Sequence, residues 1–267
     1  AFAGSLSLTN IENATVTGFK GPITINGGVE NITITDAEDF TLSSATGLKT
    51  VTLDVDKASD PALTATQKAP SAYGAQPTAG YTNGTPALSF ASMSNLTSVT
   101  LTGFYKSVSF ASLANLATVD MDVTTGDLTI SGNNSLTSLD VTGSEIGNVS
   151  ITSNTGISTV ELDQTTDLNF YGTTADRKSV SLTVTGNSEL TSLTSSANSI
   201  MTLNVQDNDK LTVVNFAGLT SFGTATSSSN PTVDVYDNDL TASNASDTDD
   251  GLTQYSVDGT NDAKDLG

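Results

Sequence analysis

The side chains in this sequence that are able to do chemistry are almost all carboxylates and hydroxyls. The chain has 23 Asp, 6 Glu and about 30% Ser plus Thr, but no His, no Cys and only nine Lys plus Arg. These residue types exclude a His–Cys zinc site, a Ser–His–Asp triad, a thiol nucleophile and a disulfide framework. The formal net charge of −20 makes nucleic acid an unfavourable partner, because the chain repels phosphate and releases no counterions on binding it.

One acidic motif occurs twice, each time after an apolar strand pattern that we assign to the second strand of a repeat. The two copies are Asp207–Asn208–Asp209 and Asp237–Asn238–Asp239, and Asp54 with Asp56 resembles them loosely. Oxygen ligands clustered at a turn suit a hard cation such as Ca²⁺. The alternative is that Asp and Asn cap turns by bonding to their own backbone. The motif predicts calcium binding with the candidate ligands Asp54, Asp56, Asp207, Asp209, Asp237 and Asp239.

A second group of carboxylates is expected to lie in a row. Asp120, Asp140 and Glu161 each stand between two apolar residues in successive repeats, so strand pairing would stack them about 4.8 Å apart. Three carboxylates in register repel one another unless a cation or a basic partner lies across them. We therefore expect a contact stripe here, with a row screened only by water and salt as the alternative.

The elements that position these residues recur at a nearly fixed interval. A long pattern, apolar-x-x-apolar-x-apolar, alternates with a short pattern, apolar-polar-apolar, and the long pattern recurs in steps near 20 residues, with one step of 48. The long pattern occurs at Ile11/Ala14/Val16, Val29/Ile32/Ile34, Leu48/Val51/Leu53, Leu96/Val99/Leu101, Leu116/Val119/Met121, Leu136/Leu139/Val141, Ile157/Val160/Leu162, Val180/Leu182 and Ile200/Leu203/Val205. The short pattern occurs at Leu6–Leu8, Ile23–Ile25, Phe40–Leu42, Leu88–Phe90, Val108–Phe110, Leu128–Ile130, Val149–Ile151 and Leu168–Phe170.

Two short strands per repeat, in constant order, predict an all-β fold with little or no helix. Each coil of about 20 residues would give one strand to each of two parallel sheets, with apolar side chains facing inward. An antiparallel sandwich also has strands every 8–12 residues or so, but it does not need the same pattern at the same phase in every unit. The spacing therefore favours a parallel β-solenoid over residues 1–240.

One repeat carries a family resemblance. The segment from Gly126 to Val141, GDLTISGNNSLTSLDV, resembles the G-x-L-x-I-x-x-N-x-x-L-x-x-L unit of receptor L-domains and related leucine-rich-repeat-like proteins of cell surfaces, with weaker copies at 186–193 and 208–214. The resemblance implies a right-handed solenoid displayed outside the cell, and no ligand is carried over. Animal L-domains contain disulfides, and this Cys-free chain is more similar to microbial surface proteins, including S-layer-type proteins.

Two segments interrupt the repeat. The step of 48 locates an insertion loop at about residues 56–87, which holds four of the six prolines together with Tyr73 and Tyr81. A loop of this length is either a contact arm, with the two tyrosines as interface anchors, or a tolerated excursion. Residues 241–267 lose the apolar spacing and form an acidic tail, which reads as a linker, the start of a further domain or a solvated terminus.

Other surface features support weaker alternatives. The outward Ser and Thr of the first sheet form a predicted hydroxyl ladder, which resembles ice-binding faces but is also explained by the β-propensity of Thr. Polysaccharide-active β-helices use carboxylate pairs, but the low aromatic content of 6% leaves few platforms for stacking on sugars. Among seven Asn-x-Ser/Thr sequences, Asn133 and Asn148 are expected in turns from which a glycan could project.

These observations predict a structural protein and no enzyme. We expect a domain of an S-layer-type or other extracellular assembly at the cell surface, stabilised by Ca²⁺ and in contact with copies of itself and with envelope glycans. The alternative is an adhesin or ligand-binding module that uses the insertion and the second sheet. No stretch approaches the roughly 20 apolar residues that a transmembrane helix needs.

Overall fold

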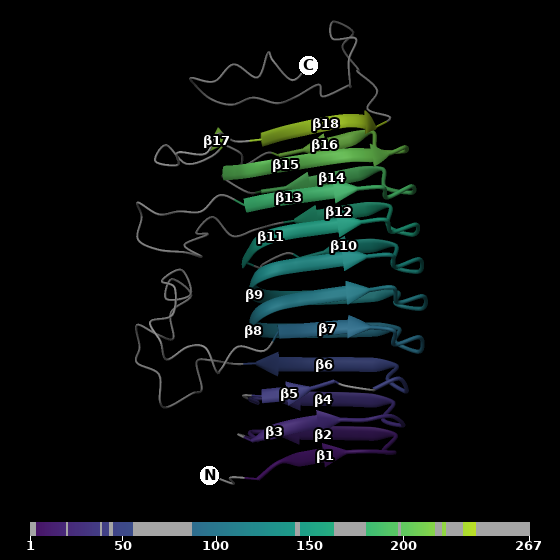
Figure 1. Ribbon diagram of the computed structural model, residues 1–267, viewed down its shortest axis with the longest axis vertical. Helices are drawn as coiled ribbons and strands as arrows, with labels where there is room; N and C mark the ends of the chain where they lie inside the picture. The colour runs from purple at the N-terminus through teal and green to yellow at the C-terminus, as the bar shows by residue number, and fades with distance from the viewer. Residues whose placement is uncertain are drawn as a thin grey trace, which may run out of the picture.

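The computed structural model consists of β-strands that stack along one long axis, from the N-terminus at one end to the C-terminus at the other (Figure 1). It describes residues 4–19, 21–37, 39–42, 45–55, 87–141, 145–162, 180–196, 199–216, 221–222 and 232–238. The described residues contain no helix, and the strand pairs among them are parallel. The prediction of an all-β parallel solenoid with two strands per coil is confirmed.

Each coil gives one strand to each of two sheets that face one another. Two long strands, β8 (Ser98–Ala111) and β9 (Thr118–Ser131), bend and run through both sheets. The first sheet further contains β1 (Leu6–Leu8), β3 (Pro22–Ile25), β5 (Asp39–Thr41), β7 (Ala87–Ala91), β11 (Glu145–Thr152), β13 (Val180–Thr185), β15 (Ser199–Asn208), β17 (Ser221–Phe222) and β18 (Thr232–Asn238). The second sheet contains β2 (Asn13–Thr17), β4 (Asn31–Thr35), β6 (Thr50–Val55), β10 (Ser138–Asp140), β12 (Thr159–Leu162), β14 (Ser192–Ser195) and β16 (Val213–Asn215).

The strand register sets the length of a coil. In the middle of the solenoid Val99 pairs with Val119, and Leu128 pairs with Val149, so coils repeat every 20 or 21 residues. Because side chains alternate along a strand, this register places apolar residues inward in every coil. The repeat interval expected from the sequence is thus the interval of the stacked coils.

The core is a narrow column of apolar side chains between the two sheets. Phe90 and Phe110 stack with ring centroids 5.0 Å apart and ring planes at 4°, and Ile130 and Ile151 continue their row in the next coils. A further row comes from the turns between the sheets, where these residues are fully buried: Leu48, Leu96, Leu116, Leu136, Ile157, Leu190 and Leu211. Each coil buries its apolar face only against its neighbours, as in other solenoids.

The phase predicted from the sequence is wrong after Leu162. Val180/Leu182 and Leu203/Val205, expected in the second sheet, lie in β13 and β15 of the first sheet. The cause is a second long connection, because Val149 of β11 pairs with Leu182, 33 residues later. That connection happened to put a first-sheet strand at a step of 20 from β12, which mimicked the repeat.

The long connections all occur at the same corner of the coil, between a second-sheet strand and the next first-sheet strand. Paired residues are 48 apart between β6 and β8, 33 apart between β12 and β14, and 30 apart between β15 and β18, compared with 20 or 21 elsewhere in the central coils. The predicted insertion loop, with Tyr73 and Tyr81, lies outside the described residues except for its last residue, Ala87. The acidic tail 241–267 also lies outside them.

A buried tyrosine holds the bend of β8. Tyr105 is fully buried, and its hydroxyl lies 3.0 Å from the carbonyl oxygen of Thr102 and 3.2 Å from that of Leu53 in β6. Burial, and to a lesser extent the negative charge of Asp54, raise the pKa of the Tyr105 hydroxyl far above its usual value. The side chain therefore stays neutral and ties β8 to the strand after which the longest connection leaves the solenoid.

We expect the Tyr105 hydroxyl to make the protein sensitive to alkali. Its folded-state pKa lies above the unfolded-state value of about 10, so the folded state holds the proton more tightly and stability falls by roughly 1.4 kcal/mol per pH unit above pH 10. Urea unfolding of the wild type and Tyr105→Phe between pH 8 and 11.5 measures this. Tyr105→Phe should lose about 1 kcal/mol below pH 10 but show a shallower alkaline decline; equal slopes above pH 10 would contradict the assignment.

Candidate functional site

The predicted carboxylate stripe lies on the outer face of the second sheet. Asp120 of β9 pairs with Asp140 of β10, and Asp140 pairs with Glu161 of β12. All three residues are exposed, and their inward neighbours are buried. The register thus stacks the three carboxylates on adjacent strands, at the strand spacing of about 4.8 Å.

The row that contains the stripe changes chemistry along the solenoid. Thr15, Thr33, Thr52 and Thr100 occupy the same outward register position in the N-terminal coils, and Thr194 follows Glu161 at the other end. Thr100 pairs directly with Asp120. One sheet face therefore joins a hydroxyl half to an acidic half.

The outer face of the first sheet is mainly hydroxyl and carries little charge. Its central row was expected to hold seven Ser and Thr, and the register connects them in two runs. The first run is Ser7, Thr24 and Thr41, and the second is Ser89, Ser109, Thr129, Ser150 and, beyond the prediction, Thr183. Charged groups are thus more frequent on the second sheet, which makes that sheet the better candidate for binding ions.

A buried ladder of asparagine side chains, which the sequence reasoning missed, runs along the turns after the first sheet. The asparagine ladder consists of Asn133, Asn154, Asn187, Asn208 and Asn238. The first four are fully buried. Each stands three residues after the last inward residue of its strand, for example Ile130 before Asn133, and this constant offset is the signal that could have revealed the ladder.

Every rung of the asparagine ladder has its polar atoms paired. The backbone N–H and Nδ2 of one Asn both donate to Oδ1 of the next at 3.0–3.3 Å. Nδ2 also donates to a strand carbonyl of the preceding coil at 2.9–3.1 Å. At the N-terminal end, the backbone N–H of Leu113 donates to Asn133 Oδ1 at 3.1 Å. Because buried amides are costly when unpaired, the ladder fixes the register of the coils.

The ladder accounts for the repeated acidic motif. Asn208 and Asn238, the central residues of the two copies, are rungs, and the motif follows first-sheet strands rather than second-sheet strands as expected. Asp207 has a φ of 55°, a left-handed conformation that Asp tolerates, and Gly132 and Gly186 hold the same position in other coils with φ of 63° and 65°. Asp209 is an exposed turn residue. The motif thus has a complete role in the turn.

The remaining calcium candidates are dispersed. Asp54 is a half-buried residue of β6 that pairs with Thr35 and Thr102, while Asp56, Asp239 and the side chain of Asp237 lie outside the described residues. Among the residues that the structure describes, no three or more His, Cys, Asp or Glu side chains come together in a group suited to a metal ion. A calcium site within one chain therefore stays a prediction for residues beyond that part.

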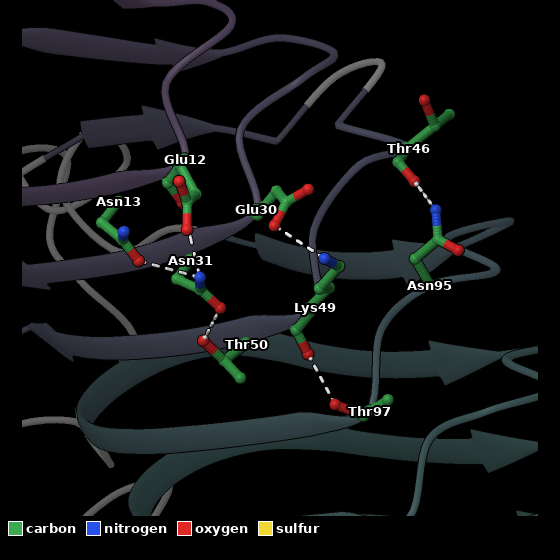
Figure 2. A network of polar contacts seen from close by, with 9 residues as sticks. All are labelled: Glu12, Asn13, Glu30, Asn31, Thr46, Lys49, Thr50, Asn95 and Thr97. Carbon is green, nitrogen blue, oxygen red and sulfur yellow. Dashed lines mark hydrogen bonds and ion pairs between the residues drawn. The ribbon is translucent and has the colours of Figure 1, made fainter.

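Polar side chains also connect neighbouring coils at the start of the second sheet (Figure 2). Asn31 Nδ2 donates to Asn13 Oδ1 at 2.9 Å, and the Thr50 hydroxyl donates to Asn31 Oδ1 at 2.7 Å. Beside them, Lys49 Nζ and Glu30 form an ion pair at 2.7 Å between adjacent coils. Both partners of this pair are exposed, so its contribution to stability is small.

A row of hydroxyls repeats these contacts along the whole solenoid. In several coils a Ser or Thr just before the second-sheet strand donates to a backbone carbonyl of the preceding coil, at 3.0–3.3 Å. The donors are Thr97, Ser158, Thr191 and Thr212. Much of the Ser and Thr excess thus serves to join coils.

The glycan positions expected from the sequence change accordingly. Asn133 is fully buried as a ladder rung, so the expectation of a glycan at this turn is wrong. Asn148 is exposed, but it lies within β11 and donates to Asp127 Oδ1 at 2.7 Å. Glycosylation of Asn148 would break this contact between neighbouring strands.

Comparison with known proteins gives no relative for this chain: no family model, no curated protein and no solved structure matches it. In the described residues, no helix is long and apolar enough to cross a membrane.

Proposed function

We propose that this chain is a structural, non-enzymatic domain of an extracellular surface assembly of the S-layer type, in which copies of the chain contact one another through cations. The observation that carries the proposal is the stripe of Asp120, Asp140 and Glu161, which stacks three exposed carboxylates on adjacent strands of a regular sheet.

The stripe is suited to contact with a second molecule rather than to a site within one chain. Carboxylates in register on neighbouring strands repel each other. Their oxygens form one row on a flat face, so they leave the other side of a bound cation open. A divalent cation that prefers six to eight oxygen ligands would take the remainder from water or from another chain. Bridging between copies is therefore the arrangement that relieves the repulsion best.

The interior of the solenoid supports a mechanical role. Amide and hydroxyl side chains that a catalytic protein would place in a cleft are here engaged between coils, in the asparagine ladder and in the hydroxyl row before the second sheet. These bonds resist sliding of one coil past another. The resemblance of the Gly126–Val141 repeat to cell-surface L-domains supports an extracellular setting.

The test is assembly of the full chain, observed by electron microscopy and light scattering while Ca²⁺ is varied. We expect ordered assemblies at millimolar Ca²⁺ that EDTA disperses, and none for the triple variant Asp120→Asn, Asp140→Asn, Glu161→Gln. A control with the same charge change elsewhere, Glu12→Gln, Asp127→Asn, Asp209→Asn, should assemble like the wild type.

Three outcomes would count against the proposal in different ways. A wild type that stays monomeric at every Ca²⁺ concentration removes the assembly. Assemblies that survive EDTA remove the cation. Equal loss in both triple variants shows a general effect of charge and removes the stripe. Circular dichroism of each variant verifies that the solenoid is intact.

The adhesin alternative depends on residues 56–87, which lie almost wholly outside the described residues. It stays a prediction, as does contact with envelope glycans.

A further inference from the structure

The second sheet ends in an apolar edge at the C-terminal end of the solenoid. Within the described residues β16 pairs only with β14. Its inward residue Val214 and the following Phe216 are only partly buried, whereas Leu193 and Val160, at the same position in the two preceding coils, have no exposed surface. Val213, in an outward row otherwise made of Ser, Thr and Asn, is 48% exposed. The edge thus has the composition of a surface that another strand covers.

The path of the chain leads back to this edge. β18 pairs with β15 in the first sheet and ends at Asn238, the last described rung of the asparagine ladder. In four preceding coils the turn after the rung enters the second sheet, with a buried Leu or Ile three residues after the Asn and an inward strand residue six residues after it. Asn133, followed by Leu136 and Leu139, is one example. The residues after Asn238 therefore arrive beside β16.

One segment after Asn238 has the sequence of a second-sheet strand. Leu252–Thr253–Gln254–Tyr255–Ser256–Val257 has the same order of apolar and polar residues as Leu136–Val141 and Leu211–Phe216. The segment directly after the rung does not, because Ser243 follows Leu240 at the position of the first inward residue.

We propose that Leu252–Val257 pairs in parallel with β16 and forms the next strand of the second sheet in the same chain. In this register Leu252 lies over Leu211, Tyr255 over Val214 and Val257 over Phe216. The interaction would cover the apolar edge of β16 and close the C-terminal end of the core.

The same chain is the favoured source of this strand for reasons of distance. Thirteen residues separate Asn238 from Leu252, a linker that reaches up to roughly 40 Å when extended. A segment tethered this closely has an effective concentration in the millimolar range, which a separate copy does not match at ordinary protein concentrations.

The absence of Cys from the chain allows a direct test by disulfide formation. The proposed register pairs Asn215 with Ser256 on the outer face, at a strand spacing that lies within the Cα separation of about 4.4–6.8 Å that disulfides require. The double variant Asn215→Cys, Ser256→Cys should form an intrachain disulfide in a glutathione redox buffer, detected by peptide mass spectrometry. The matched control Asn215→Cys, Ser246→Cys should form at least tenfold less.

Linking in the first pair that is no more efficient than in the control overturns the proposal, and so does a disulfide-linked dimer in place of the intrachain bond. Hydrogen exchange of the full chain provides a second measurement. Tyr255→Asp should speed amide exchange in residues 212–216 at least tenfold and leave residues 133–141 unchanged. Unchanged exchange in residues 212–216 contradicts the proposal.

Discussion

Replacing Asn154 by Ala is expected to lower the free energy of unfolding by about 3–5 kcal/mol, because several buried polar groups lose their partners at once. Asn154 Oδ1 accepts from the backbone N–H and Nδ2 of Asn133, and its own Nδ2 donates to Ile130 O and Asn187 Oδ1. All of these contacts except the ones made by the backbone of residue 154 disappear in Asn154→Ala. Urea unfolding followed by circular dichroism measures the change.

The neighbouring turn offers a matched control of the same residue type. Asn134 is exposed and accepts one hydrogen bond from the Thr155 hydroxyl at 2.9 Å. Asn134→Ala should therefore cost no more than roughly 0.5 kcal/mol. Equal losses in the two variants would show that the amide ladder has no special weight in stability.

Phe110→Ala is expected to have a similarly large effect, about 3–5 kcal/mol, through loss of apolar burial and formation of a cavity. Phe110 is fully buried and stacks on Phe90 in the preceding coil. In later coils this register position holds Ile130 and Ile151, so Phe110→Ile should cost clearly less than Phe110→Ala. Ser109→Ala, on the outer face of the same strand, serves as the control and should be close to neutral.

The position of the damage is as informative as its size. In a solenoid each coil contacts only its neighbours, so loss of the Phe110 ring should weaken protection against hydrogen exchange mainly in β7, β8 and β9. The strands β14 and β16 should keep their protection. Uniform loss along the chain would show that the solenoid unfolds as one cooperative unit.

The fold was predictable because its determinants are local and repeated. A coil of 20 or 21 residues, with apolar residues two apart in each strand, leaves little choice of sheet topology. The phase after Leu162 was not predictable, because a first-sheet strand and a second-sheet strand share the same alternation of apolar and polar residues. Only the pairing partner distinguishes them, and pairing is a tertiary property.

The candidate site was predictable only in part, and for a similar reason. The stacking of Asp120, Asp140 and Glu161 follows directly from the period, since equal steps give equal register. The acidic motif around Asn208 was interpreted from its two carboxylates, whereas the buried residue is the amide between them. Whether an Asn at a turn faces water or the core depends on the turn conformation, which a single sequence does not contain.

The asparagine ladder has a consequence for the solenoid as a whole. In every rung the side-chain carbonyl faces the N-terminal end and the NH₂ group donates toward the C-terminal end, as in Asn154 between Asn133 and Asn187. Amide dipoles aligned in this way add together and strengthen one another. The ladder thus gives the solenoid an electrical polarity along its long axis, with the positive side of the dipole column toward the C-terminal end, so the two ends of the protein differ in their attraction for charged groups.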